Sequence, residues 1–250
     1  MSAKPQLTPE EQAAQTAKFQ AYIDEKIANA KKALAGLLPY TQEQVDKLVK
    51  ACAKVVYDNG EELARNAVDD TGYGVYTDKI AKNKNKAKVI WWSLKDKKSV
   101  GIIEHEEATG LVKVASPVGV VGAITPVTNP IVTVMSNAMF AIKGRNPIIF
   151  AVHPKAMKCC KKTIDYINAE LKKLGAPEHT IQLIDIAHLE LTKMLSKSVD
   201  VIIATGGMDM VRSAYASRKP ALGVGAGNVP ALTDRAVDLA AALTTAPTGP

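Results

Sequence analysis

The chain has 250 residues, of which 47% are hydrophobic and 23% are charged, and its mean hydropathy is close to zero. This composition is typical of a folded globular protein and excludes a disordered chain or a collagen-like fibre. No apolar run approaches the ~20 residues of a membrane-spanning helix, and the polar residues 1–11 lack the apolar centre of a secretory signal. We therefore expect a cytoplasmic protein with no membrane contact. Three cysteines without metal-type spacing predict neither a disulfide framework nor a zinc site.

Residues 1–99 are predicted to form an N-terminal helical segment that packs on the domain after it. Apolar residues recur at helical spacing from Phe19 to Leu38. Thr41 and Gln44 have the spacing of a capping box, which predicts the start of a second helix that ends at Asn59-Gly60. A third helix is expected over 61–68.

A lysine-rich stretch over 79–98 carries eight lysines and one aspartate, which accounts for the net charge of +7. We interpret it as a solvated basic helix. Attraction of a small polyanion is an alternative. A nucleic-acid groove is not favoured, because the stretch contains no arginine.

The pattern changes at Val100. Residues 100–116 predict a β-hairpin, with strands at 100–103 and 111–115 and with His105 exposed in the polar turn. Over 117–243, apolar strands alternate with helices, which favours a parallel sheet covered on both faces. The expected fold is therefore a doubly wound, Rossmann-like α/β domain that carries the helices and the hairpin. Residues 244–250 are expected to be a disordered tail. The predicted strands are 118–124, 147–152, 181–186 and 199–204, and the predicted helices are 132–142, 154–174, 189–196 and 208–217.

Parallel sheets bind ligands beyond the carboxyl ends of their strands, so the segments after the strands are the candidate sites. Residues 202–208 form a buried strand, the pair Gly206-Gly207 and a helix start, a geometry that suits a phosphate. A tight turn without a ligand is the equal alternative. The glycines of 223–227 do not have the dinucleotide spacing G-x-G-x-x-G, and by themselves they predict a permissive loop.

Two polar side chains follow other strands of the predicted sheet. Asn129 is either an ordinary helix N-cap or a donor to a developing oxyanion. His153 is either a loop histidine at a helix start or a contact to a ribose or a phosphate.

Taken together and in order, these segments resemble the aldehyde dehydrogenase superfamily, and within it the CoA-acylating branch. The resemblance covers about residues 15–240. The stretches that carry it are Asp70 to Gly74, Asp78 to Ile80, Thr125 to Pro130, Phe150 to Ala156, Ala204 to Met210, and Gly223 to Pro230.

The resemblance implies a role for each part of the cleft. Asn129 matches the oxyanion-hole asparagine. His153, followed by Pro154, stands where many relatives place a lysine beside the adenosine ribose, which leaves NAD and NADP both open. The residues expected on the nicotinamide side are Thr125, Pro126 and Val127, and those expected at the pyrophosphate are Thr205, Gly206, Gly207 and Met210.

Val224 and Gly225 fall where hydrolytic relatives carry a glutamate and its neighbour. That glutamate activates the water that releases the acid. Since a valine cannot take a proton, the acyl group is expected to leave on coenzyme A, which makes NAD, CoA and a small aldehyde the implied ligands. Nucleic acid is not an expected partner, and a homo-oligomer is possible.

The nucleophilic cysteine of the family is expected near position 258, beyond Pro250, whereas Cys52, Cys159 and Cys160 lie in other segments. The sequence therefore predicts the cofactor-binding portion of an acylating aldehyde dehydrogenase, cut before its catalytic domain and inactive alone. A non-catalytic module that binds NAD or a partner is the alternative.

Overall fold

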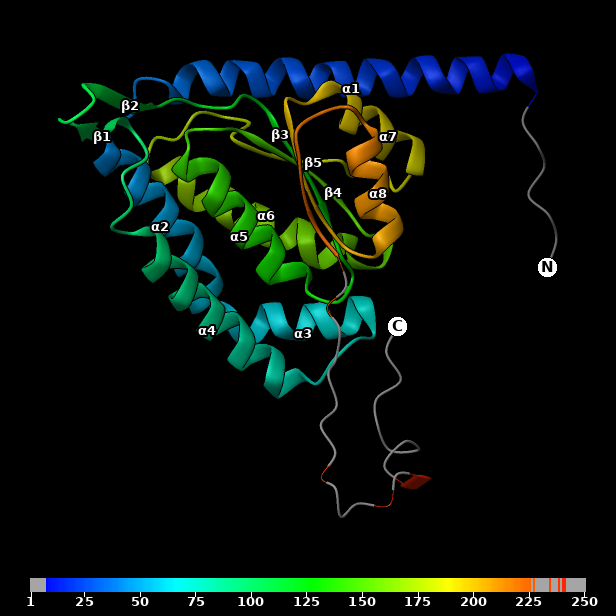
Figure 1. Cartoon of the computed structure of the whole chain (residues 1–250). Helices are drawn as coiled ribbons and strands as arrows, with labels where there is room; N and C mark the ends of the chain where they lie inside the picture. The colour runs from blue at the N-terminus through cyan, green and yellow to red at the C-terminus, as the bar shows by residue number, and fades with distance from the viewer. Residues whose placement is uncertain (1–7, 226, 228–233, 235–237, 239, 242–250) are drawn as a thin grey trace.

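The computed structural model describes residues 8–225, 227, 234, 238, 240 and 241 of the chain. Its centre is a parallel sheet with the strand order β5-β4-β3-β6-β7 (Figure 1). The first strand of this sheet along the chain is the central strand β3, and β4 and β5 follow on one side of it. The chain then crosses back, and β6 pairs with the other side of β3. This order confirms the doubly wound fold and creates a switch point between β3 and β6. The strands are β3 (Val121–Thr125), β4 (Ile148–Val152), β5 (Ile181–Leu183), β6 (Val201–Thr205) and β7 (Ala221–Val224).

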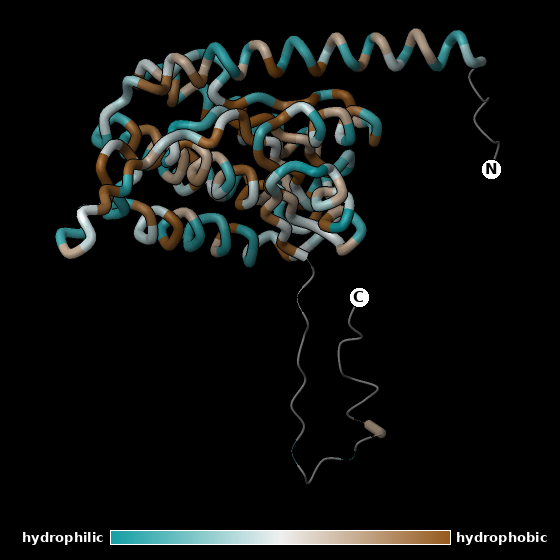
Figure 2. Tube along the Cα trace, turned by 45° about the horizontal axis from the view of Figure 1, so that its top comes forward, coloured by the Kyte–Doolittle hydropathy of each residue, from teal (hydrophilic) through white to brown (hydrophobic). Residues whose placement is uncertain are grey.

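Helices cover both faces of the sheet. Successive side chains of a strand point to opposite faces, so each apolar strand contributes to the core on both sides of the sheet. Phe150 of β4 joins the core under α2 to α6, whereas its neighbours Ile149 and Ala151 join the core under α1, α7 and α8. Hydrophobic residues concentrate between these layers (Figure 2). The helices are α1 (Pro9–Leu37), α2 (Gln42–Asp58), α3 (Gly60–Thr71), α4 (Tyr76–Leu94), α5 (Pro130–Lys143), α6 (Met157–Lys173), α7 (Leu189–Ser198) and α8 (Met208–Ala216).

Capping explains where the first two helices begin. The capping box at Thr41 and Gln44 is present as predicted. A second box at Thr8 and Glu11 starts α1 ten residues before Phe19, where its apolar stripe begins. The first turns of α1 therefore extend past the body of the molecule (Figure 1).

Several predicted bounds were wrong for local reasons. Residues 118–120 are not a strand, because their amides donate to the side chains of Asn146 and Asp200. The helix expected over 154–174 opens with a 3₁₀ turn, Pro154–Ala156, before α6. The third helix extends to Thr71, and the strand expected over 181–186 ends at Leu183.

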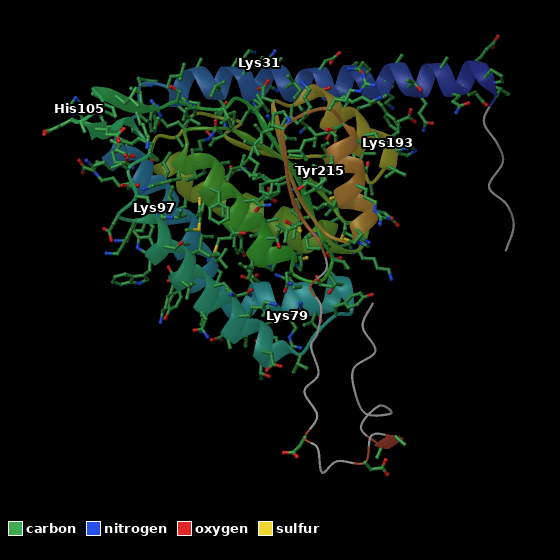
Figure 3. All side chains as sticks on the ribbon, viewed as in Figure 1. Lys31, Lys79, Lys97, His105, Lys193 and Tyr215 are labelled. Atoms are coloured by element: carbon green, nitrogen blue, oxygen red, sulfur yellow. The ribbon has the colours of Figure 1, made fainter. Side chains whose placement is uncertain are left out.

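Two further differences concern β-structure. β7 was missed, because its glycine favoured a loop, yet it pairs with β6 from Ala221 to Val224. In the hairpin, β1 (Gly101–Glu106) is longer than expected, since it keeps pairing with β2 (Leu111–Ala115) through His105. His105 is exposed, and Figure 3 places it at the far end of the hairpin.

In the described part of the chain, we find no helix long and apolar enough to cross a membrane. The expected tail 244–250 lies outside the described residues.

Candidate active site

A cleft of about 490 Å³ opens at the carboxyl edge of the sheet, at the switch point between β3 and β6. A smaller hollow of about 170 Å³ adjoins it and shares Thr125, His153 and Met210. The fold thus gathers every site residue predicted from the sequence around these two spaces. The cleft is bordered by Thr125, Pro126, Val127, Asn129, His153, Thr205, Gly206, Gly207, Met210, Val224 and Gly225, and the hollow adds Pro154.

The double-glycine turn forms one wall of the cleft. β6 runs into Gly206, whose amide donates to the carbonyl of Val224 at 3.1 Å, and α8 then begins at Met208. Gly207 occupies the N-cap position and offers no side chain to the amides of the first turn. A Cβ built on Gly207 would meet nothing within 4 Å, so open space lies beside Gly207, which borders the cleft. Free helical amides facing open space fit the diphosphate of a dinucleotide.

β7 brings Val224 and Gly225 to the same wall. Val224 pairs with Thr205 and is 57% exposed at the cleft. A Cβ on Gly225 would lie 2.6 Å from the sulfur of Met208, so the chain passes the start of α8 closely. Met208 is 50% exposed, so a larger residue at 225 would displace this flexible side chain and leave the backbone in place.

The hydroxyl of Thr125 is not exposed at the cleft. The side chain borders the cleft, but its Oγ1 atom is buried and has no hydrogen-bond partner among the described residues. The Cys160 thiol approaches this hydroxyl from inside the protein without a hydrogen bond of normal geometry. In this conformation Thr125 offers the cleft carbon atoms and backbone, not a hydroxyl.

Asn129 also borders the cleft. It occupies the N-cap position of α5, yet its side chain makes no capping bond. Instead its Oδ1 accepts a hydrogen bond from the ammonium of Lys82. An ammonium can only donate, so the orientation of the amide follows from this contact, and the Nδ2 group remains available as a donor. The ordinary N-cap interpretation is therefore wrong for this side chain.

His153 stands on the rim between the cleft and the hollow. Its Nδ1 accepts the amide hydrogen of Lys155 at 3.1 Å, so it caps the 3₁₀ turn as a loop histidine would. The side chain is nevertheless exposed and borders both spaces. Because Nδ1 is occupied, a neutral ring carries its proton on Nε2, which can donate to a ligand.

Residues 2–249 match the Aldehyde dehydrogenase family. The chain belongs to this family. It is 55% identical over 216 residues to a succinate-semialdehyde dehydrogenase (acetylating) of Clostridium kluyveri, covering 86% of this chain and 48% of that protein. It is 48% identical to a sulfoacetaldehyde dehydrogenase of an Acholeplasma species, covering 81% and 42%. An acetylating aldehyde dehydrogenase from Geobacillus thermoglucosidasius superposes with a TM-score of 0.83 at 39% identity, covering 86% and 48%.

This member of the aldehyde dehydrogenase family thus spans about half the length of the relatives it matches. The resemblance to the CoA-acylating branch is confirmed by relatives named as acetylating enzymes. The roles of the individual cleft residues stay predictions.

The three thiols of this aldehyde dehydrogenase chain lie inside the protein. Cys52 is fully buried in α2, and burial raises its pKa to about 12. In α6, the hydrogen bond with Cys159 and burial raise the pKa of Cys160 well above its ordinary value. None of the three borders the cleft, and a protonated thiol is a poor nucleophile.

Sequence reasoning missed two residues that contact the border of the cleft. Lys82 contacts Asn129, and Lys79 donates from its Nζ to the carbonyl of Thr128 at 3.1 Å. The interpretation of 79–98 as a solvated basic helix holds for Lys82, which is exposed, whereas Lys79 is half-buried. Their spacing of three residues places them on one face of α4, but the sequence carries no signal for what that face would meet.

Proposed function

We propose that this chain is the NAD(P)-binding portion of a CoA-acylating aldehyde dehydrogenase. The reaction is the conversion of an aldehyde, NAD⁺ and CoA into acyl-CoA, NADH and a proton. The observation that carries the proposal is that one cleft joins two features: the uncapped amides at the start of α8, directly after Gly206-Gly207, and the Nδ2 group of Asn129, which has no hydrogen-bond partner among the described residues. A dinucleotide held at the first would reach towards the second.

In this proposal the chain binds and orients, and a bound nicotinamide supplies the acceptor for hydride. The amides at the start of α8 hold the diphosphate. Asn129 donates from Nδ2 to the carbonyl oxygen as negative charge develops on it, a contact that is typically worth about 10²–10³ in rate. Val224 supports transfer to a thiol, since a side chain without a basic atom cannot activate water at that point of the cleft.

Two relatives narrow the class of aldehyde. They are named for succinate semialdehyde and sulfoacetaldehyde, which carry a carboxylate and a sulfonate beside the aldehyde. We therefore propose a small aldehyde with a second, anionic group as the substrate. The choice between NAD and NADP, the cytoplasmic location and the lack of a nucleic-acid partner stay predictions.

Self-association belongs to the same proposal. The hairpin exposes the apolar side chains of Ile102, Leu111 and Val114, each about 60% accessible. Such side chains on a projecting hairpin are suited to pairing with a second copy of the chain. Light scattering on the wild-type chain would give its oligomeric state.

Titration of the chain with NADH, followed by its fluorescence, tests the binding proposal. We expect a saturable signal, and parallel titration with NADPH reads the cofactor preference. Gly207→Ala is the matched variant: its Cβ clashes with nothing in the free protein, so thermal stability should fall only by the small cost of alanine at an N-cap, while NADH binding weakens. The absence of a saturable signal at millimolar NADH would refute the proposal, as would equal binding by Gly207→Ala and wild type.

A further inference from the structure

Two lysines of a single helix contact adjacent residues at the border of the cleft. Lys79 and Lys82 lie three residues apart in α4, and their ammonium groups reach the adjacent residues Thr128 and Asn129. Figure 3 shows Lys79 near the N-terminal end of α4, below the sheet. The helix is fixed there by Asn83, which is 4% exposed and donates to the carbonyl of Gly60 at 3.1 Å.

This pair is charged without a counter-charge. Two other lysines of α4 have compensating partners: Lys84 pairs with Glu61 at 2.8 Å, and Lys88 lies over the ring of Tyr57. Within the described residues, neither Lys79 nor Lys82 forms a salt bridge, and both ammonium groups contact neutral oxygens. Each ammonium has three donors and uses one of them, so donors remain for a ligand.

The surroundings add to the positive potential. α5 begins at Pro130, directly after Asn129, and its N-terminus carries partial positive charge. Burial, and then repulsion from Lys82, lower the pKa of Lys79. Holding the two cations together therefore costs free energy in the empty protein, and a bound anion would recover it.

We propose that Lys79 and Lys82 form an anion subsite beside Asn129 that binds the carboxylate or sulfonate of an anionic aldehyde. The subsite rests on the proposed function, because it assigns a place to the second group of that substrate. The aldehyde carbonyl lies at Nδ2 of Asn129, and the anionic end lies at the two ammonium groups on the Oδ1 side of the same amide. Charge-assisted hydrogen bonds to both lysines select the charged substrate over a neutral one of similar size.

The test uses succinate as the probe and the side-chain amide signal of Asn129 in ¹⁵N NMR as the readout, on the whole chain at fixed low ionic strength. We expect a saturable shift with succinate and with ethanesulfonate, and none with neutral succinamide. Lys79→Gln and Lys82→Gln should each weaken succinate binding about fivefold or more, as expected for the loss of one charged contact near a surface. Lys82→Arg should retain succinate binding, because it keeps the positive charge.

Glutamine at position 82 is chosen because its amide can still donate to Oδ1 of Asn129, so the variant removes charge and keeps a donor. Lys86→Gln is the matched control, as Lys86 is exposed on the same helix and forms no salt bridge with the described residues. The proposal is overturned if succinamide binds like succinate, if Lys82→Gln binds like wild type, or if Lys86→Gln is equally harmful. NADH titration of the wild-type chain keeps the two proposals apart: a normal succinate response without NADH binding refutes the dinucleotide site alone, and NADH binding without a succinate response refutes the anion subsite alone.

Discussion

The ion pair between Lys143 and Asp46 anchors α5, the helix whose first turn follows Asn129. The Lys143 side chain is 6% exposed, whereas the carboxylate of Asp46 is 24% exposed. Gln42 also donates to Asp46, at 3.0 Å, and its own carbonyl oxygen accepts the amide of Ser99 at 2.7 Å. One carboxylate therefore connects α2, α5 and the segment that enters the hairpin.

We predict that Asp46→Asn lowers the free energy of unfolding by about 3 kcal/mol. Asparagine keeps the shape but leaves a buried ammonium without a counter-charge, and breaking a buried pair in this way costs ~3–5 kcal/mol. The partial exposure of Asp46 places the expected value at the lower end. For a chain of this length, about 3 kcal/mol corresponds to a fall of roughly 6–12 °C in Tm.

Urea unfolding followed by circular dichroism measures the change. The control is Glu43→Gln, because the Glu43–Lys47 pair on the same helix is 78% and 62% exposed and solvent screens it, so its loss should change the stability little. The double variant Asp46→Leu with Lys143→Met should recover most of the loss, since both charges are then removed. An Asp46→Asn cost no larger than that of Glu43→Gln would refute the reasoning.

Three further outcomes are expected. Burial raises the pKa of the Cys52 thiol from 9.0 to about 12, so the contribution of this thiol to stability is complete below pH 9 and is lost as the pH rises towards 12. Urea unfolding between pH 8 and 11 should therefore show a steeper loss of stability for the wild type than for Cys52→Ala. Tyr22→Phe removes the 2.6 Å bond to Asp185 that ties α1 to the loop after β5, and should cost about 1 kcal/mol in the same assay. Gly36→Ala should destabilise by about 1–3 kcal/mol, because its Cβ would lie 2.7 Å from a ring carbon of Pro177; a more stable variant would show that helix propensity outweighs the clash.

The sequence predicted the architecture well, because its signals are local. An apolar run such as 148–152 reads as a buried strand wherever the chain places it, and the capping box at Thr41 starts a helix through bonds within four residues. The pair Gly206-Gly207 between a strand and a helix likewise defines its own geometry. Bounds failed where a distant side chain took over the backbone bonds, as Asp200 does for Val120.

The sequence by itself thus determined the alternation of strands and helices, and with it the edge of the sheet at which the cleft opens. Only the tertiary structure decided what faces that cleft. Lys82 and Asn129 are 47 positions apart, and no periodicity in either segment specifies their contact. The contact between Lys82 and Asn129 forms because α4 packs beside α5. How elements distant in sequence pack depends on the whole set of buried contacts and not on any one segment.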